Sequence, residues 1–197
     1  MRVINCLQNS PEWFAARLGK PTASNFDQII TTKGGPSKQR TKYLYRLAGE
    51  RVAGKAETYQ NVNMIRGIEM EKEAREFHKL MTDEEIVQVG FCTDDEGKYG
   101  ASPDALFGKK GGLEIKCPLM ETHVGYLLHG ILPMEYFQQI QGNLFVTGRE
   151  WWIFESYYPA IKPFIIKVER DEKFIKALKF ELKIFVQELE TIVKKIS

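Results

Sequence analysis

The sequence has few residues of the kinds that build metal–sulfur sites or disulfide frameworks. Its 197 residues include three cysteines, Cys6, Cys92 and Cys117, which lie too far apart to form a CxxC pair. The three histidines are equally isolated, and none has a ligand partner four residues further along the chain. Zinc and iron–sulfur sites normally need clusters of these residues, so neither kind of site is expected. An odd number of scattered cysteines instead indicates reduced thiols.

Long apolar segments are also missing. No hydrophobic run approaches the ~20 residues that a membrane-spanning helix needs. The first residues, MRVINCLQNSPEW, become polar too early for a secretory signal peptide. We therefore expect a cytoplasmic protein. The net charge of +2 neither favours nor excludes a nucleic-acid ligand, because basic side chains can cluster on one face while acids offset them elsewhere.

Internal repeats and low-complexity tracts are absent from the sequence as well. Hydrophobic residues make up 43% of the chain and charged residues 27%, values that are typical of globular proteins. A chain of this length can bury a full hydrophobic core. The expectation is therefore a single domain over residues 1–197.

Apolar periodicity predicts helices on both sides of a set of strands. The expected elements, in chain order, are two short helices within residues 10–30, helices at about Thr41–Ala53 and Asn63–Met81, three strands between Ile86 and Ile115, a helix at about Met134–Phe145, two strands in EWWIFESYY and PFIIKVE, and a helix over Asp171–Ile196. This order predicts an α/β or α+β fold in which helices flank a central mixed sheet.

Two of the expected helices carry a clear apolar stripe. In the helix at Asn63–Met81 the stripe residues are Met70, Ala74, Phe77 and Met81. Glu71 lies about 100° from Met70 and therefore beside the buried face, although periodicity alone does not exclude Glu69 or Glu73. The stripe of the last helix consists of Phe174, Leu178, Leu182, Phe185, Leu189, Ile192 and Ile196.

A group of charged residues lies in the stretch SPDALFGKKGGLEIKCP. In a strand, Leu113 and Ile115 point to one face, whereas Glu114 and Lys116 point to the other. Asp104 belongs to the preceding strand, so pairing of the two strands brings it towards Glu114. Two adjacent carboxylates repel each other unless a cation lies between them, and hard oxygen ligands without histidine suit Mg²⁺ or Mn²⁺.

Two interpretations of this hairpin remain open on its own residues. One is a metal site for phosphodiester hydrolysis, in which the cation polarises the phosphoryl group and the carboxylates fix the geometry. The other is a solvated hairpin with a cross-strand ion pair, a common feature that contributes little to stability.

Further segments extend this pattern along the chain. Pro103-Asp104, followed by Glu114-Ile115-Lys116, resembles the PD-(D/E)xK nuclease signature. The segments that carry the wider resemblance are WFAARLGKPTASNF (13–26), GIEMEKEAREF (67–77), ASPDALF (101–107), GLEIKCP (112–118), EYFQQIQGNLFVTG (135–148) and VERDEKFIKAL (168–178). In order and spacing they resemble the lambda-exonuclease group, also called the YqaJ viral-recombinase group. The resemblance covers nearly the whole chain.

The resemblance implies roles for the residues of the charged hairpin. Asp104 and Glu114 would be the metal-binding carboxylates, and the Ile115 carbonyl would add a backbone oxygen ligand. Lys116 would position or activate the attacking water. Glu71 would be the acid that a helix contributes to the site.

The resemblance also implies roles outside the hairpin. Gln139 would lie near the site, and Arg17, Ser24 and Ser102 would hold a 5′-phosphate. Asp94 matches a further acidic position whose role is less defined. Each residue also has an ordinary structural interpretation, such as a solvated charge for Arg17 or a helix cap for Ser24.

The function implied by the resemblance is a Mg²⁺-dependent 5′→3′ exonuclease acting on double-stranded DNA, an alkaline-type deoxyribonuclease. Mn²⁺ would be able to replace Mg²⁺, with two ions per site. The enzyme would be phage or bacterial, would leave 3′ overhangs, would work with a single-strand-annealing recombinase and would form a ring-shaped homotrimer. The alternatives are a PD-(D/E)xK endonuclease of the restriction or resolvase type and a non-catalytic module that binds DNA ends. The loop Lys33–Lys42 fits either a linker or a DNA-backbone contact.

Overall fold

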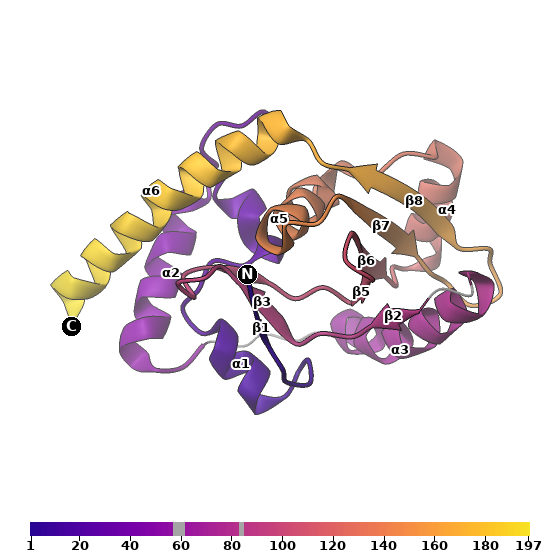
Figure 1. Cartoon of the computed structure of the whole chain (residues 1–197), viewed down its shortest axis with the longest axis horizontal. Helices are drawn as coiled ribbons and strands as arrows, with labels where there is room; N and C mark the ends of the chain where they lie inside the picture. The colour runs from indigo at the N-terminus through magenta and orange to yellow at the C-terminus, as the bar shows by residue number, and fades with distance from the viewer. Residues whose placement is uncertain (57–61, 83–84) are drawn as a thin grey trace.

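A computed structural model describes residues 1–56, 62–82 and 85–197 of the chain (Figure 1). The elements are β1 (Arg2–Ile4), α1 (Pro11–Arg17), the 3₁₀ helix η1 (Ala23–Gln28), α2 (Arg40–Ala53), α3 (Val62–Thr82), β2 (Ile86–Val87), β3 (Phe91–Thr93), β4 (Gly100–Ala101), β5 (Ala105–Phe107), β6 (Gly111–Lys116), α4 (Met120–His129), the 3₁₀ helix η2 (Met134–Tyr136), α5 (Phe137–Thr147), β7 (Trp151–Ser156), β8 (Phe164–Glu169) and α6 (Glu172–Ile196). The expected mixed α/β fold is confirmed.

The strands form two sheets. One has five strands in the order β2-β5-β6-β7-β8, and the other has three in the order β1-β3-β4. All neighbouring strands are antiparallel except β6 and β7, which are parallel. A parallel pair needs a long crossover, and here the crossover consists of α4, η2 and α5. This crossover lays α5 against the strand that carries Glu114.

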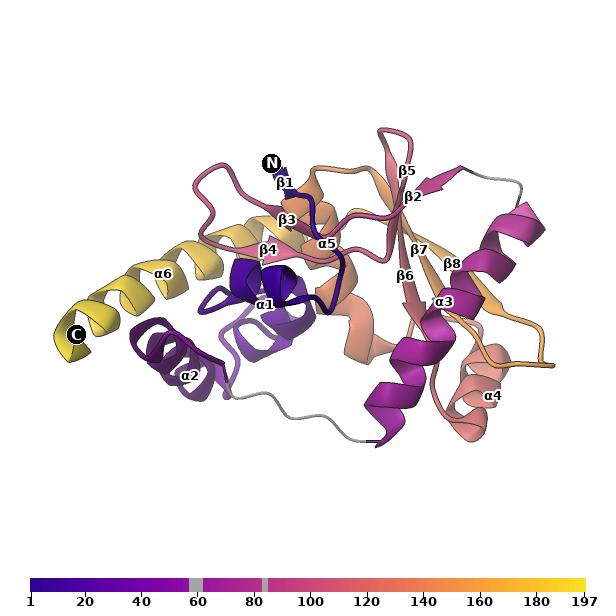
Figure 2. The same ribbon diagram turned by 90° about the horizontal axis from the view of Figure 1, so that it is seen from below.

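Helices cover both faces of the five-stranded sheet. Leu113 and Ile115 of β6 pack with Ala74 of α3 on one face. On the other face, Trp152 and Phe154 of β7 pack with Ile140 and Leu144 of α5. Figure 2 shows α3 and α4 at one end of the molecule, with α2 and α6 at the other.

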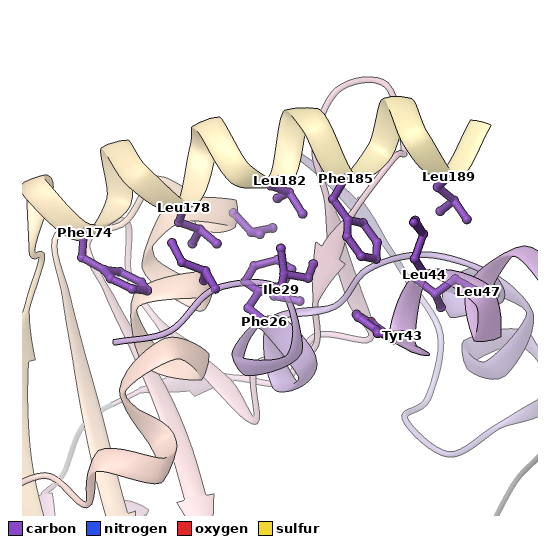
Figure 3. Packing of buried hydrophobic residues seen from close by; sticks show 14 of the residues in the cluster. Phe26, Ile29, Tyr43, Leu44, Leu47, Phe174, Leu178, Leu182, Phe185 and Leu189 are labelled. Atoms are coloured by element: carbon purple, nitrogen blue, oxygen red, sulfur yellow. The ribbon is translucent and has the colours of Figure 1, made fainter. Parts of the chain in front are cut away.

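The second end of the molecule is built on α6. Its buried residues pack against η1 and α2 (Figure 3), and the cluster includes Phe26, Ile29, Tyr43, Leu44, Leu47, Phe174, Leu178, Leu182, Phe185 and Leu189. The expected stripe of α6 is therefore correct from Phe174 to Leu189. It is too long at its C-terminal end, where Ile192 is partly buried and Ile196 is 53% exposed. The helix continues past the core that it covers.

The structure corrects several expected elements. The three strands expected between residues 86 and 115 are five short ones, and they are divided between the two sheets. The helix expected from Met134 begins as η2 and becomes α-helical only at Phe137. Strand β1 and helix α4 are additional. Part of the loop expected after α2 lies outside the described residues. No helix within the described ranges is long and apolar enough to cross a membrane.

Candidate active site

Strand β6 places Glu114 in the interior of the molecule. The side chain points towards α5, because Glu114 is in register with Phe154, which packs on that helix. Ile115 points to the opposite face and packs with α3. The residue alternation expected from the sequence is thus present, but Glu114 is only 3% exposed and does not lie on a solvated hairpin.

Three donors surround the Glu114 carboxylate. Lys116 Nζ lies 2.6 Å from Oε1, and Gln139 Nε2 lies 2.5 Å from the same oxygen. Asn143 Nδ2 donates to Oε2 at 2.9 Å. Gln139 and Asn143 are one turn apart on α5, so a single helix face supplies both amides. The buried charge is therefore stabilised by one ammonium group and two neutral donors.

Asp104 lies beside this group at the start of β5. Its Oδ2 accepts a hydrogen bond from the backbone N–H of Ile115 at 2.6 Å. Burial raises the pKa of Asp104 well above its ordinary value, and the carboxylates of Glu114 and Glu71 raise it further. The Lys116 ammonium opposes this shift only in part. Asp104 thus lies in a crowded set of carboxylates.

Lys116 carries a full positive charge in this environment. Burial alone would lower the pKa of its ammonium group, but the carboxylates of Glu114 and Asp104 outweigh that effect and raise the pKa above its ordinary value. The ammonium group also lies 5.2 Å from the centre of the Tyr136 ring. Lys116 can therefore donate hydrogen bonds to a water molecule or to a phosphate oxygen.

Helix α3 contributes Glu71 to the edge of the same site. Arg75, one turn further along the helix, lies 3.4 Å from Glu71 Oε1. The same guanidinium nitrogen donates to the backbone carbonyl of Asp104 at 3.3 Å. Arg75 therefore connects α3 to Asp104, the residue that directly precedes β5.

A cleft of about 470 Å³ opens onto these groups. The residues that line it include Arg66, Glu71, Ile115, Lys116 and Tyr136. Both cationic and anionic side chains border this space. A phosphate group and a cation can both be accommodated by such a lining.

The oxygen atoms at this site suit a hard divalent cation. Across the described ranges, no group of three or more His, Cys, Asp or Glu side chains has an arrangement that could hold a metal ion. The donor set is instead two carboxylates, Asp104 and Glu114, with the backbone of Ile115 at the cleft. Burial and the neighbouring carboxylates of Glu114 and Glu71 raise the pKa of Asp104, and a dication would offset both effects by stabilising the ionised carboxylate.

A second polar group surrounds Arg17 on α1. Arg17 Nη1 donates to Ser102 Oγ at 2.8 Å, and Nη2 lies 3.5 Å from Thr22 Oγ1. Trp13 stacks on the guanidinium at 4.2 Å and also donates to Ser102 Oγ at 2.9 Å. Ser24 joins the group through Thr22, whose hydroxyl lies 3.3 Å away.

Arg17 has no acidic partner within hydrogen-bond distance among the described residues. Burial lowers the pKa of its guanidinium to about 10, and Tyr43 and Glu114 oppose that shift. The side chain therefore remains charged at neutral pH. A half-buried guanidinium bordered by hydroxyl groups is suited to bind an anion.

Asp94 is not part of either group. Its Oδ1 accepts from the backbone N–H groups of Lys98 at 2.6 Å and Tyr99 at 3.3 Å. These bonds close the turn between β3 and β4, and the carboxylate faces a depression beside α6. The geometry of Asp94 therefore points to a local role in the turn.

The sequence prediction did not include several residues that contact the site. On the carboxylate side, Asn143 contacts Glu114 and Arg75 contacts Glu71. On the other side, Trp13 contacts both Arg17 and Ser102, and Thr22 contacts Arg17. Helical spacing was the available signal, since Asn143 follows Gln139, Arg75 follows Glu71 and Arg17 follows Trp13 by four residues each.

Comparison with known proteins adds independent information. Residues 12–150 match the protein family described as YqaJ-like viral recombinase domain. An alkaline exonuclease from Laribacter hongkongensis, whose structure has also been solved in complex with dAMP, shares 35% sequence identity and superposes with a TM-score of 0.87 over 95% of this chain and 96% of the other. A phage-related exonuclease from Haemophilus somnus has the same fold at 12% identity, with a TM-score of 0.74 over 90% of this chain and 96% of the other. No curated protein sequence gives a significant match.

Proposed function

Because this chain belongs to the YqaJ-like viral recombinase family and is a DNA nuclease, we propose that it is a Mg²⁺-dependent exonuclease that degrades duplex DNA ends in the 5′→3′ direction. One observation carries the proposal. The buried carboxylates of Asp104 and Glu114 lie beside Lys116, and Arg17 donates to Ser102, two residues before Asp104 in the chain. In this proposal, the cutting centre at Asp104 and Glu114 and an anion-binding group at Arg17 act together on one DNA end.

In this proposal, the site holds two Mg²⁺ ions, which Mn²⁺ can replace. Asp104, Glu114 and the Ile115 carbonyl are the ligands, and Glu71 is the acid at the edge of the site. The bound metal would supply Lewis-acid stabilisation of the phosphoryl charge and a more acidic water. Lys116, as a charged donor, orients the attacking water and the scissile phosphate. Gln139 holds the Glu114 carboxylate in place.

The Arg17 pocket accounts for the direction of cleavage. Arg17, Ser24 and Ser102 would bind the terminal 5′-phosphate through one guanidinium and two hydroxyl groups. A terminal phosphate held at a fixed position places one particular phosphodiester bond at Asp104 and Glu114. Cleavage would then release mononucleotides from the 5′ end and leave a 3′ overhang.

The proposal includes partners. A 3′ overhang is the substrate of a single-strand-annealing recombinase, which we propose as the protein that acts next. We also propose that three copies form a ring around the DNA, because closed symmetry would keep the enzyme on its product strand. The absence of a large positive net charge is compatible with this arrangement, since a ring needs basic side chains only on its inner face.

Digestion of defined DNA substrates tests the proposal. The substrates are linear duplexes with a 5′-phosphate, linear duplexes with a 5′-hydroxyl, and covalently closed circles, each in Mg²⁺ and in EDTA. We expect mononucleotides from the 5′-phosphorylated ends in Mg²⁺, slower digestion of 5′-hydroxyl ends, and intact circles. Cleaved circles would indicate the endonuclease alternative, and release from the 3′ end would reject the polarity.

The preference for a 5′-phosphate can be assigned to the pocket by one substitution. Arg17→Lys retains a positive charge but loses the forked guanidinium and its stacking on Trp13. We expect this variant to lose most of its preference for 5′-phosphorylated ends. Binding of DNA ends by the wild-type protein without any cleavage would instead support the non-catalytic module.

A further inference from the structure

The two oxygens of the Glu114 carboxylate have different surroundings. Oε1 accepts from Lys116 and Gln139, and Lys116 lines the cleft. Oε2 accepts from Asn143, which is 1% exposed and is not part of the cleft lining. One side of the carboxylate is therefore near the substrate space, and Asn143 holds the other side from within the core.

Asn143 is itself held firmly in place. Its helix α5 is packed on the sheet through Ile140 and Leu144, neither of which is exposed. Thr147 donates to the backbone carbonyl of Asn143 at 2.7 Å. The backbone of Asn143 is therefore held in place by the packing of α5. Its side-chain amide can fix the orientation of the Glu114 carboxylate that it contacts.

The chemistry of the amide matters as much as its position. Lys116 already places one positive charge beside Glu114, and a second cation at the position of Asn143 would weaken the attraction of the carboxylate for a metal further. A primary amide donates a hydrogen bond without adding a net charge, so it orients the carboxylate without this additional loss. Such donors behind a ligand typically alter metal affinity by ~10–100-fold when they are removed.

We infer that Asn143 is a positioning residue that orients the Glu114 carboxylate for the catalytic divalent cation. The inference rests on the proposed function, because it assumes that Glu114 is a metal ligand. It extends the proposal to a residue that touches neither the metal nor the DNA. It also separates the two amides of α5, since Gln139 approaches the cleft-side oxygen whereas Asn143 approaches the other.

The test compares Asn143→Leu with a matched control on the same helix. Gln141 is also 1% exposed, and its amide donates to the Glu169 carbonyl and accepts from the Asp171 N–H, both at 2.9 Å. Gln141→Leu therefore removes a buried amide of α5 that does not contact Glu114. Asn143→Ala serves as a smaller substitution if the leucine variant does not fold.

Two readouts are needed. The affinity for Mn²⁺ alone is measured by titration calorimetry on each folded variant without DNA, and the Mg²⁺ concentration for half-maximal cleavage is measured separately. We expect Asn143→Leu or Asn143→Ala to lower the affinity for Mn²⁺ and to raise the Mg²⁺ concentration for half-maximal cleavage, each by ~10-fold or more. For Gln141→Leu, both quantities should stay within about twofold of wild type. Binding of 5′-phosphorylated DNA in EDTA should be unchanged in all variants.

The outcomes distinguish the inference from the proposed function. If wild type needs a divalent metal for cleavage but the Asn143 variants bind Mn²⁺ as wild type does, the inference is wrong and the proposed function stands. Equal weakening in Gln141→Leu would also overturn it, because the effect would then come from general disturbance of α5. If wild type neither binds Mn²⁺ nor needs a divalent metal, the proposed function fails first.

Discussion

At the scale of single residues, the site brings together carboxylates that repel one another when no ligand is bound. Asp104 and Glu114 are 7% and 3% exposed, and their mutual repulsion contributes to the raised pKa of Asp104. Lys116 relieves only part of this conflict. The residues are thus arranged for the charge of a ligand and not for the stability of the ligand-free chain.

The cost of this arrangement predicts the behaviour of Asp104→Asn. The variant keeps the shape and the acceptor that faces the Ile115 N–H, but it removes one of the crowded carboxylates. In EDTA we expect its melting temperature to equal that of wild type or exceed it by about 2–4 °C, which corresponds to ~1 kcal/mol for a chain of this size. Nuclease activity in Mg²⁺ should fall at least ~100-fold.

Thermal melting in EDTA and in Mg²⁺ gives the measurement for Asp104→Asn. Wild type should gain stability when Mg²⁺ is added, and the variant should gain less. A variant that melts well below wild type in EDTA would show that Asp104 stabilises the fold, contrary to the repulsion argued above. Full nuclease activity of Asp104→Asn would show that cleavage does not require the Asp104 carboxylate.

Cys92 allows a prediction about pH at a residue remote from the carboxylates. The thiol is fully buried, and burial raises its pKa to about 11, with Arg149 opposing the shift. The relevant pH window extends from ~8.5, the ordinary pKa of a thiol, to about 11, the raised pKa of Cys92. As the pH rises through this window, the thiol loses its proton in the unfolded chain before it does so in the folded chain. The free energy of unfolding should therefore fall with rising pH in this window, by at most ~1.4 kcal/mol per pH unit for this group.

Two measurements examine the Cys92 prediction. In the native protein at pH 8, iodoacetamide should label the partly exposed Cys6 well before Cys92. The variant Cys92→Ala should show a shallower loss of stability than wild type between pH 9 and pH 11 in urea titrations. Rapid labelling of native Cys92, or identical pH slopes, would contradict the argument.

At the scale of secondary-structure elements, the attachment of α3 is the notable feature. The helix carries Glu71 and packs on β6, and its C-terminal half is joined to β7 by a buried pair. His78 Nδ1 lies 2.5 Å from Glu155 Oε2, and the two residues are 2% and 0% exposed. Within the described structure, the remaining atoms His78 Nε2 and Glu155 Oε1 have no hydrogen-bond partner.

This pair predicts a non-additive response to substitution. His78→Leu and Glu155→Leu should each destabilise the protein by ~3–5 kcal/mol, because each leaves one buried polar partner alone. The double variant should lose much less than the sum of the two single losses. Urea denaturation at pH 7 measures all three free energies, and simple additivity would show that the two side chains do not interact energetically.

The elements also show what periodicity can and cannot predict. Spacing identified the central part of each stripe, because α3 and α6 each bury one continuous face. Both predicted stripes were too long at the C-terminal end, where Met81 of α3 is 63% exposed and Ile196 of α6 is 53% exposed. The split of the strands between two sheets was not identified from spacing. β3 and β4 are short, and β3 pairs both with β4 and with β1, which is 87 positions away in the register Ile4–Phe91. Pairing over such a distance depends on tertiary packing, which local patterns do not contain.

The same distinction applies to the site. Alternation in β6 correctly separated Glu114 and Lys116 from Ile115, because that pattern is local. The sequence did not predict Asn143 as a site residue, because its contact with Glu114 depends on how α5 packs on β6. Asp94 was included through resemblance, but it lies in a turn whose backbone it caps.

At the scale of the whole molecule, α6 connects segments that are far apart in the sequence. Its buried face contacts η1 and α2 near the N-terminus (Figure 3), while its first turn follows β8 of the five-stranded sheet. Leu178 is fully buried in this contact, whereas Ile196 is 53% exposed on the same stripe. The two residues provide a matched comparison of how much this helix holds the fold together.

Truncation of these two side chains should give very different results. Leu178→Ala should destabilise the protein by ~2–5 kcal/mol, because it leaves a cavity between α6 and the residues of η1. Ile196→Ala should change the free energy of unfolding by less than ~0.5 kcal/mol. Urea midpoints of both variants measure the difference, and a loss of similar size in both would mean that the end of α6 is packed in solution.

The pairing of β1 with β3 has a consequence for how the chain is made. Residues 2–4 leave the ribosome before their partners at 91–93 have been synthesised. Likewise, Arg17 cannot contact Ser102, nor Glu114 contact Asn143, until the later residue of each pair has been synthesised. Until then the nascent N-terminal segment has an unpaired strand edge, and such edges favour aggregation. The nuclease is therefore expected to become active only after the chain has been synthesised beyond Asn143.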